Sequence, residues 1–278
     1  MIRILFSLGV GALAARLVWL AAHSVFAAPV LLRTNWRGRS VPTAAGLVLP
    51  VVLLLVEAGR SLGAAAAGDL PGATVARFLV VTATIGFALL GAIDDLLGSA
   101  EVRGFRGHVG ALASGRVTTG VLKLVGGAAL AVVVVAPLTR SSGRLLLDAA
   151  LVALAANLAN LLDRAPGRVI KASLAAFVAI TVAARARASL EGVAVVVGAA
   201  VGLAVDDLRE RLMLGDAGAN ALGGALGLAI VLGTGPGART AALVVVASLN
   251  VAGELVSFSR VIDAVPPLRA LDRAGRLP

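Results

Sequence analysis

Residues 75–98 read VARFLVVTATIGFALLGAIDDLLG, an apolar run that ends in two adjacent aspartates, Asp94 and Asp95. About 20 apolar residues are enough for a helix to cross the hydrocarbon core of a bilayer, so this run predicts a membrane span with two carboxylates at its end. Similar runs recur along the 278 residues, which are 59% hydrophobic and 14% charged. Soluble domains are about half apolar and a quarter charged. The sequence therefore predicts an all-α polytopic membrane protein.

We expect nine spans, which form a single transmembrane domain over residues 1–258, followed by a basic cytoplasmic tail over residues 259–278. The first apolar run resembles a signal peptide, but Arg16 interrupts it and no soluble domain follows, which favours a retained helix. The expected spans lie at about 4–24, 43–58, 75–93, 119–138, 145–162, 170–184, 191–206, 217–233 and 239–257.

The charged residues predict the orientation of these spans. Of the 25 Lys and Arg residues, sixteen fall on one set of alternate loops and eight on the other. The positive-inside rule places the richer set in the cytoplasm, so the N-terminus is expected outside and the C-terminus inside. Ten of the fifteen acidic residues share the cytoplasmic side. If the protein carries out chemistry, we expect it on that face.

Composition also excludes several kinds of site. The chain has no cysteine and only two histidines, His23 and His108, which excludes disulfides, thiolate sites and His-rich metal sites. The net charge of +10 comes from arginines spread over short loops without stacking aromatics, a pattern that indicates membrane topology and anionic headgroups and no nucleic-acid partner. In the tail, Arg269, Arg273 and Arg276 share one helical face, which predicts a helix lying on the cytoplasmic leaflet of the bilayer.

Two expected helix ends carry clustered polar side chains. Asp94 and Asp95 close one span, and because consecutive helical residues point about 100° apart, we expect them to have different roles, unless they are a solvated acid pair. Asn157, Asn160 and Asp163 lie one turn apart at the end of another span. Such residues either line a wet cavity or join packed helices.

Further candidates surround these two clusters. Arg168 and Lys171 follow the second cluster and supply the positive charge that a phosphate-bearing substrate needs. Asp216 begins the eighth span, either as a helix N-cap or as a metal ligand. Arg39 and Thr43 belong to a basic loop that enters the second span. Carboxylates on separate cytoplasmic loops with flanking arginines suit Mg²⁺ and phosphate better than zinc.

Four of these segments, in order, resemble motifs of the polyprenyl-phosphate N-acetylhexosamine-1-phosphate transferases. This family includes phospho-N-acetylmuramoyl-pentapeptide transferase and the GlcNAc-1-phosphate transferases. The segments VPTAAG (41–46), IDDLLG (93–98), NLANLLD (157–163) and LGDAGAN (214–220) look like the family's Pro-Thr-Met-Gly-Gly, Asp-Asp, Asn-x-x-Asn-x-x-Asp and Gly-Asp-x-Gly-Ser motifs. The resemblance spans nearly the whole chain.

The resemblance implies a multi-pass enzyme of the bacterial inner membrane. With Mg²⁺, such enzymes move a sugar-1-phosphate from a UDP-N-acetylsugar to a polyprenyl phosphate and release UMP, in cell-wall or envelope polysaccharide synthesis. It implies that Asp94 and Asp95 act on the lipid phosphate, and that Asp216 and Asp95 hold the metal. The implied substrate-binding residues are Arg39, Thr43, Asn157, Asn160, Asp163, Arg168, Lys171 and His108.

The sequence also departs from the family pattern. The later loop, residues 259–272, lacks the family's histidine cluster, Pro166 replaces an expected aspartate, and Ala219 replaces the usual serine. His108 could partly substitute for a lost histidine. A non-catalytic relative that binds lipid carrier or partner proteins therefore stays open as the alternative, whereas a transporter would show broken helices at mid-membrane. Small residues in the spans would permit a homodimer.

Overall fold

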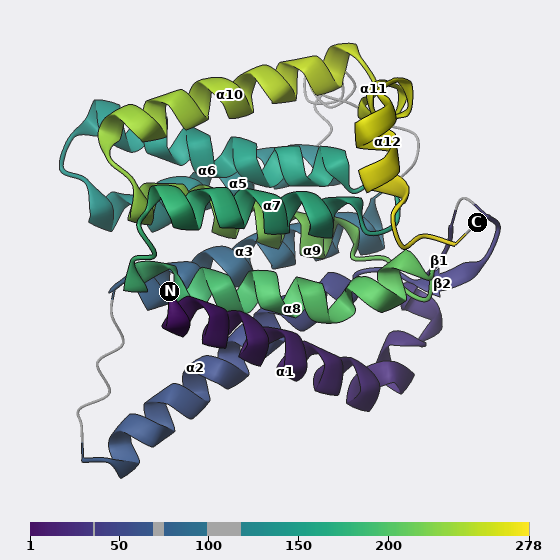
Figure 1. Cartoon of the computed structure of the whole chain (residues 1–278), viewed down its shortest axis with the longest axis horizontal. Helices are drawn as coiled ribbons and strands as arrows, with labels where there is room; N and C mark the ends of the chain where they lie inside the picture. The colour runs from purple at the N-terminus through teal and green to yellow at the C-terminus, as the bar shows by residue number, and fades with distance from the viewer. Residues whose placement is uncertain (36, 69–74, 99–117, 278) are drawn as a thin grey trace.

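The computed structural model of the chain describes residues 1–35, 37–68, 75–98 and 118–277, which form one helical bundle (Figure 1). The long helices are α1 (Ile2–Phe26), α2 (Val48–Ala66), α3 (Val75–Leu97), α5 (Thr119–Val135), α6 (Ser142–Leu162), α7 (Arg168–Ala183), α8 (Glu191–Leu208), α9 (Gly215–Gly233) and α10 (Pro236–Leu255). Two short helices, α11 (Phe258–Ala264) and α12 (Pro266–Arg273), follow. The 3-10 helices are η1 (Pro29–Leu31), η2 (Ala45–Leu47), η3 (Ala136–Leu138) and η4 (Ala188–Leu190).

The helical, multi-span character that the sequence predicts is confirmed. Within the described residues, eight helices are long and apolar enough to cross a membrane. The expected span at 119–138 coincides with the observed Thr119–Leu138, and the other expected spans match helices to within a few residues. The exception is the second expected span, which was expected to end at residue 58, whereas α2 continues to Ala66. The sixth expected span is α7, which has only 16 residues. The count of nine and the orientation remain predictions.

Helix α9 occupies the centre of the bundle, where α3 and α6 pack along it. Its sequence is rich in glycine and alanine, and nearly all of its residues are buried. The close approach of α3 depends on Gly91, because a Cβ added there would lie 2.2 Å from the carbonyl oxygen of Asp216. Small residues thus let two backbones meet, which brings the end of α3 against the start of α9.

A two-stranded antiparallel hairpin lies at this same end of the bundle. Strand β1 (Leu32–Thr34) pairs with β2 (Ser40–Pro42), and no local sequence pattern predicted this hairpin. The backbone N–H of Met213 donates to the carbonyl of Pro42 over 2.8 Å, which ties the hairpin to the loop before α9. Arg33 donates to the last carbonyls of α3, those of Asp95 and Leu96, at 3.2 Å each. We call this the hairpin end of the bundle.

The C-terminal helices α11 and α12 fold back onto the bundle at the hairpin end, and the chain terminus comes to lie beside β1 and β2 (Figure 1). In contrast, α10 is largely exposed and packs mainly on α6. Many of its exposed residues are apolar, among them Val244, Val245 and Leu255, as expected for a surface that faces lipid.

Candidate functional site

Three helices bring two carboxylates and one ammonium group together at the hairpin end. The Nζ atom of Lys123 on α5 lies 2.6 Å from Oδ2 of Asp94 on α3 and 2.5 Å from Oδ2 of Asp216 on α9. Thr119 donates its hydroxyl to the other oxygen of Asp94 over 2.6 Å. The three charged side chains are only a fifth to a third exposed. We call Asp94, Lys123 and Asp216 the charged triad.

Asp95, the neighbour of Asp94, points to a different partner, as expected for consecutive helical residues. Its two carboxylate oxygens accept the backbone N–H groups of Asp216 and Ala217, each over 3.0 Å. These are N–H groups of the first turn of α9, which lack partners within their own helix, and a carboxylate is favourable at that positive helix end. Asp95 therefore caps α9 from another helix, and Asp216 is not an N-cap.

A cavity of about 270 Å³ opens beside the charged triad. Acidic groups dominate its polar lining, and we call it the polar cavity. It is lined by Thr34, Asn35, Thr43, Asp163, Arg164, Ala165, Pro166, Asp207, Glu210, Leu212, Met213, Gly215 and Asp216. Burial, reinforced by the neighbouring carboxylates of Asp207, Asp216 and Asp95, raises the pKa of Asp163 well above the ordinary aspartate value. An acidic cavity of this kind gains stability from a bound cation.

A second cavity, of about 330 Å³, is lined by Lys123 and lies between α5, α6 and α10. Its walls are mostly apolar, with Phe87, Leu124 and Val251 among them, and we call it the apolar cavity. Three amides interrupt this lining, those of Asn157, Asn220 and Asn250, together with Glu254. Within the described part of the chain, the Nδ2 atom of Asn220 has no hydrogen-bond partner although the residue is only 3% exposed.

The structure distributes the Asn-x-x-Asn-x-x-Asp residues over different tasks. Asn157 donates to Oδ1 of Asn250 over 2.7 Å and so joins α6 to α10. The Nδ2 atom of Asn160 is buried, with no partner among the described residues. Asp163 ends α6 and lines the polar cavity. Of these three predicted residues, Asp163 alone faces the space where a water-soluble ligand would bind.

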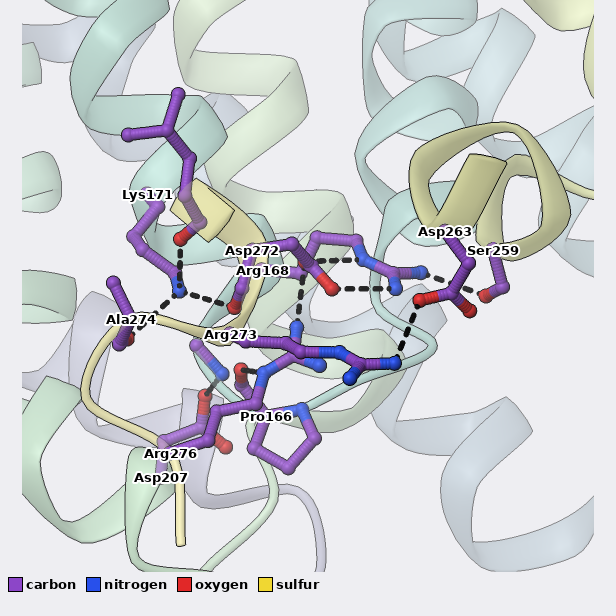
Figure 2. Close-up of polar contacts among 12 residues, drawn as sticks. Pro166, Arg168, Lys171, Asp207, Ser259, Asp263, Asp272, Arg273, Ala274 and Arg276 are labelled. Atoms are coloured by element: carbon purple, nitrogen blue, oxygen red, sulfur yellow. Dashed lines mark hydrogen bonds and ion pairs between the residues drawn. The ribbon is translucent and has the colours of Figure 1, made fainter. Parts of the chain in front are cut away.

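The predicted basic residues fit the site less well. Arg168 and Lys171, expected to bind phosphate, have their donors occupied by the C-terminal residues (Figure 2), and we withdraw them from the substrate-binding set. Arg39 is exposed on the hairpin turn and lines neither cavity. Thr43 is buried in the wall of the polar cavity. His108 lies outside the described residues.

Three residues of the site were not predicted from the sequence. Lys123 is one of only two lysines in the chain and lies within an apolar run, and an ionisable residue within a span is a signal of function. Asp207 and Glu210 line the polar cavity. Glu210 binds Asn35 and Arg37 of the hairpin turn at 3.0 and 2.9 Å, a contact that no local pattern could indicate.

The sequence matches no family model, and no curated protein matches it. The resemblance to the sugar-phosphate transferases therefore depends on the four motifs and on where the structure places their residues. Asp94, Asp95, Asp163 and Asp216 do converge at one end of the bundle.

Proposed function

We propose that the protein transfers a sugar-1-phosphate from a UDP-N-acetylsugar to a polyprenyl phosphate at the cytoplasmic membrane face, with Mg²⁺, and releases UMP. One observation carries the proposal: two paired members of the charged triad line different cavities, one polar and one apolar. Asp216 lines the first and Lys123 lines the second. A reaction between a water-soluble nucleotide and a membrane lipid needs a site of this kind.

The polar cavity supports the nucleotide side of this proposal. Its carboxylates would repel a bare diphosphate, so the substrate would have to enter together with a cation. The charged triad with Asp95 holds three carboxylates against one ammonium group, and a divalent ion would balance the difference. The acidic lining thus favours a phosphate substrate that arrives as its metal complex.

The residues present fit Mg²⁺, which proteins often bind through one or two carboxylates with substrate phosphates completing the shell. Asp94 and Asp216 would hold the ion once the Lys123 ammonium that pairs with both of them turned to the substrate phosphates. Asp95 is less suited, because both of its oxygens accept backbone N–H groups that it caps at the start of α9. Among the described residues, no three acidic or imidazole groups are placed to enclose an ion. When bound, the ion would neutralise charge on the diphosphate.

The apolar cavity supports the lipid side. It would accept the first isoprene units of the lipid, and the unpartnered amide of Asn220 would donate to an oxygen near the headgroup. Lys123 would place its ammonium between the two phosphates and stabilise the charge that develops during transfer. The lipid phosphate oxygen forms a bond to the phosphorus that carries the sugar, the phosphoanhydride bond breaks, and UMP leaves with the bonding electrons.

The second candidate function is a non-catalytic relative that binds lipid carrier. One observation favours it: Arg168 and Lys171, which follow the Asn-x-x-Asn-x-x-Asp segment, are occupied by the protein's own C-terminal residues. This candidate predicts binding of polyprenyl phosphate without nucleotide turnover.

The test is release of UMP by purified protein with undecaprenyl phosphate, Mg²⁺ and a panel of UDP-N-acetylsugars. We expect release by the wild type and by the control Asp263→Asn, whose carboxylate is exposed on the tail, and no release by Asp216→Asn. If no donor yields UMP and no nucleotide binds, the non-catalytic function is favoured instead.

A further inference from the structure

The C-terminal residues 266–277 are anchored to α7 by a buried ion pair (Figure 2). Nε and Nη2 of Arg168 donate to the two carboxylate oxygens of Asp272 over 2.8 and 3.0 Å, and Arg276 donates to the same carboxylate over 2.6 Å. Arg168 is 6% exposed and Asp272 is 8% exposed. A buried arginine–carboxylate pair with two hydrogen bonds fixes the position of one side chain relative to the other, whereas an exposed pair does not.

Lys171 completes this anchor at the end of α12. Its ammonium donates to the backbone carbonyls of Leu271, Asp272 and Ala274 over 2.9, 2.6 and 3.1 Å. The last carbonyls of a helix lack partners within the helix, and positive charge is favourable there. Helix α7 therefore presents two cations that together recognise one side chain and one helix end. We call residues 266–277 the C-terminal clamp.

The clamp reaches the polar cavity through the loop between α6 and α7. Nε of Arg276 donates to the carbonyl of Pro166 over 2.8 Å, and the next N–H, that of Gly167, donates to Oδ2 of Asp207 over 2.7 Å. Gly167 needs its positive φ of 70° for this turn. Asp163 begins the same loop, and both Asp163 and Pro166 line the cavity. Arg276 therefore fixes one wall of the cavity by a hydrogen bond to its backbone.

The clamp also touches the opposite wall. Arg37 on the hairpin turn donates to the carbonyl of Leu277 over 3.4 Å and pairs with Glu210, which lines the cavity. The described clamp residues are themselves absent from the cavity lining. Because the clamp braces both walls without entering the space between them, a lid that must open for substrate does not fit this geometry.

We propose that the C-terminal clamp is a positioning element of the polar cavity, in which Arg276 sets the place of the 163–167 loop and thereby of Asp163. The identity of the ligand that fills the cavity rests on the proposed function, whereas the bracing of the loop does not. A nucleotide bound in the cavity would then depend on a residue more than a hundred positions away in the sequence.

The first test is independent of activity and uses the absence of cysteine from the chain. A nitroxide label on Arg164→Cys, in the braced loop, reports the loop's mobility. We expect a restricted spectrum with the intact clamp and with Arg276→Lys, which keeps a donor for Pro166. Arg276→Ala and Asp272→Asn should release the label. A label equally restricted in Arg276→Ala would overturn the proposal.

The second test separates positioning from general stability. We expect Arg276→Ala to raise KM for the UDP-N-acetylsugar about tenfold, the effect of losing one charge-assisted hydrogen bond, with KM for polyprenyl phosphate unchanged and with recovery in Arg276→Lys. Arg273→Ala, which removes an exposed pair, is the matched control. An active enzyme whose nucleotide KM does not respond to Arg276→Ala contradicts the proposal. A wild type without turnover refutes the proposed function alone, because the label still decides whether the clamp braces the loop.

Discussion

At the scale of single residues, the charged triad joins three helices through one ammonium group. Lys123 contacts both Asp94 and Asp216, so its removal leaves two carboxylates facing each other without a counter-charge. The lysine therefore has two tasks, holding α3, α5 and α9 together and lowering the repulsion that a phosphate substrate would meet.

We expect Lys123→Met to abolish UMP release and to destabilise the protein. Partial solvent exposure reduces the electrostatic cost, which we place at about 1–3 kcal/mol. Thermal unfolding in detergent measures the stability change. Adding Asp94→Asn to Lys123→Met should recover much of the stability and none of the activity. If Lys123→Met unfolds at the same temperature as the wild type, the triad contributes no net attraction to stability.

Asp272 provides a prediction on pH. Burial by itself would raise the pKa of this carboxyl, but hydrogen bonds and charge from Arg168 and Arg276 lower it below the ordinary value. The groups that face it are Arg168 and Lys171 from α7 and Arg276, with Asp207 of α8 nearby. Because the pKa is lower in the folded state, the stabilisation is complete above the unfolded pKa of about 4 and is lost as pH falls through the folded pKa.

The nitroxide on Arg164→Cys should therefore stay restricted from pH 7 to about pH 4 and become mobile below that. In Asp272→Asn the mobility should be high throughout and independent of pH over this range. Release of the label at near-neutral pH in the wild-type clamp would contradict the assignment to Asp272.

At the scale of elements, the contact between α3 and α9 sets the site. Asp95 caps α9, and four residues earlier Gly91 lets the two backbones meet. The same helix therefore delivers Asp94 to the triad and fixes the start of the helix that carries Asp216.

Gly91→Ala should separate α3 from α9, because the new Cβ would lie 2.2 Å from a backbone oxygen. We expect a loss of about 1–3 kcal/mol from overpacking, with reduced UMP release. Gly59→Ala on α2 is the matched control, since nothing lies within 4 Å of its added Cβ. That change should be neutral or slightly stabilising, as for other exposed helical glycines. Equal unfolding temperatures for the two variants would argue against the close contact.

The elements also show what sequence patterns can predict. Apolar runs predicted the long helices because span length is set by bilayer thickness, a local rule. The hairpin and the docking of α12 depend on partners far away in the chain, so no local pattern predicted them.

The expected helical face of Arg269, Arg273 and Arg276 is wrong in its last member. Helix α12 ends at Arg273, and Gly275, with φ of 78°, turns the chain so that Arg276 points inward.

The same distinction holds for the candidate site. Asp94, Asp95 and Asp216 were found because acidic residues at the ends of apolar runs stand out in the sequence. Different roles for Asp94 and Asp95 were also expected, but the capping role of Asp95 was not, since it requires the start of α9 to lie beside it. Arg168 and Lys171 carry the right charge for phosphate, but the tertiary fold gives them a carboxylate and a helix end of the same chain.

For the molecule as a whole, transfer from a cytoplasmic nucleotide requires the hairpin end to face the cytoplasm. Single cysteines test this, because the natural chain has none. Ser142→Cys and Ala270→Cys lie at opposite ends of the bundle and both positions are exposed. We expect a membrane-impermeant maleimide to label Ser142→Cys in intact cells and Ala270→Cys only after permeabilisation. The reverse pattern would place the site on the wrong side for a cytoplasmic nucleotide.

A water-soluble phosphate and a lipid phosphate are proposed to meet at the charged triad. The most direct measurement follows a phosphorus label on the sugar-bearing phosphate of the UDP-N-acetylsugar, with polyprenyl phosphate and Mg²⁺. We expect the label to move into a lipid-linked sugar diphosphate while unlabelled UMP is released, and we expect Asp216→Asn to stop both. A label that stays in the nucleotide, or that leaves it without reaching the lipid, would refute transfer between the two phosphates.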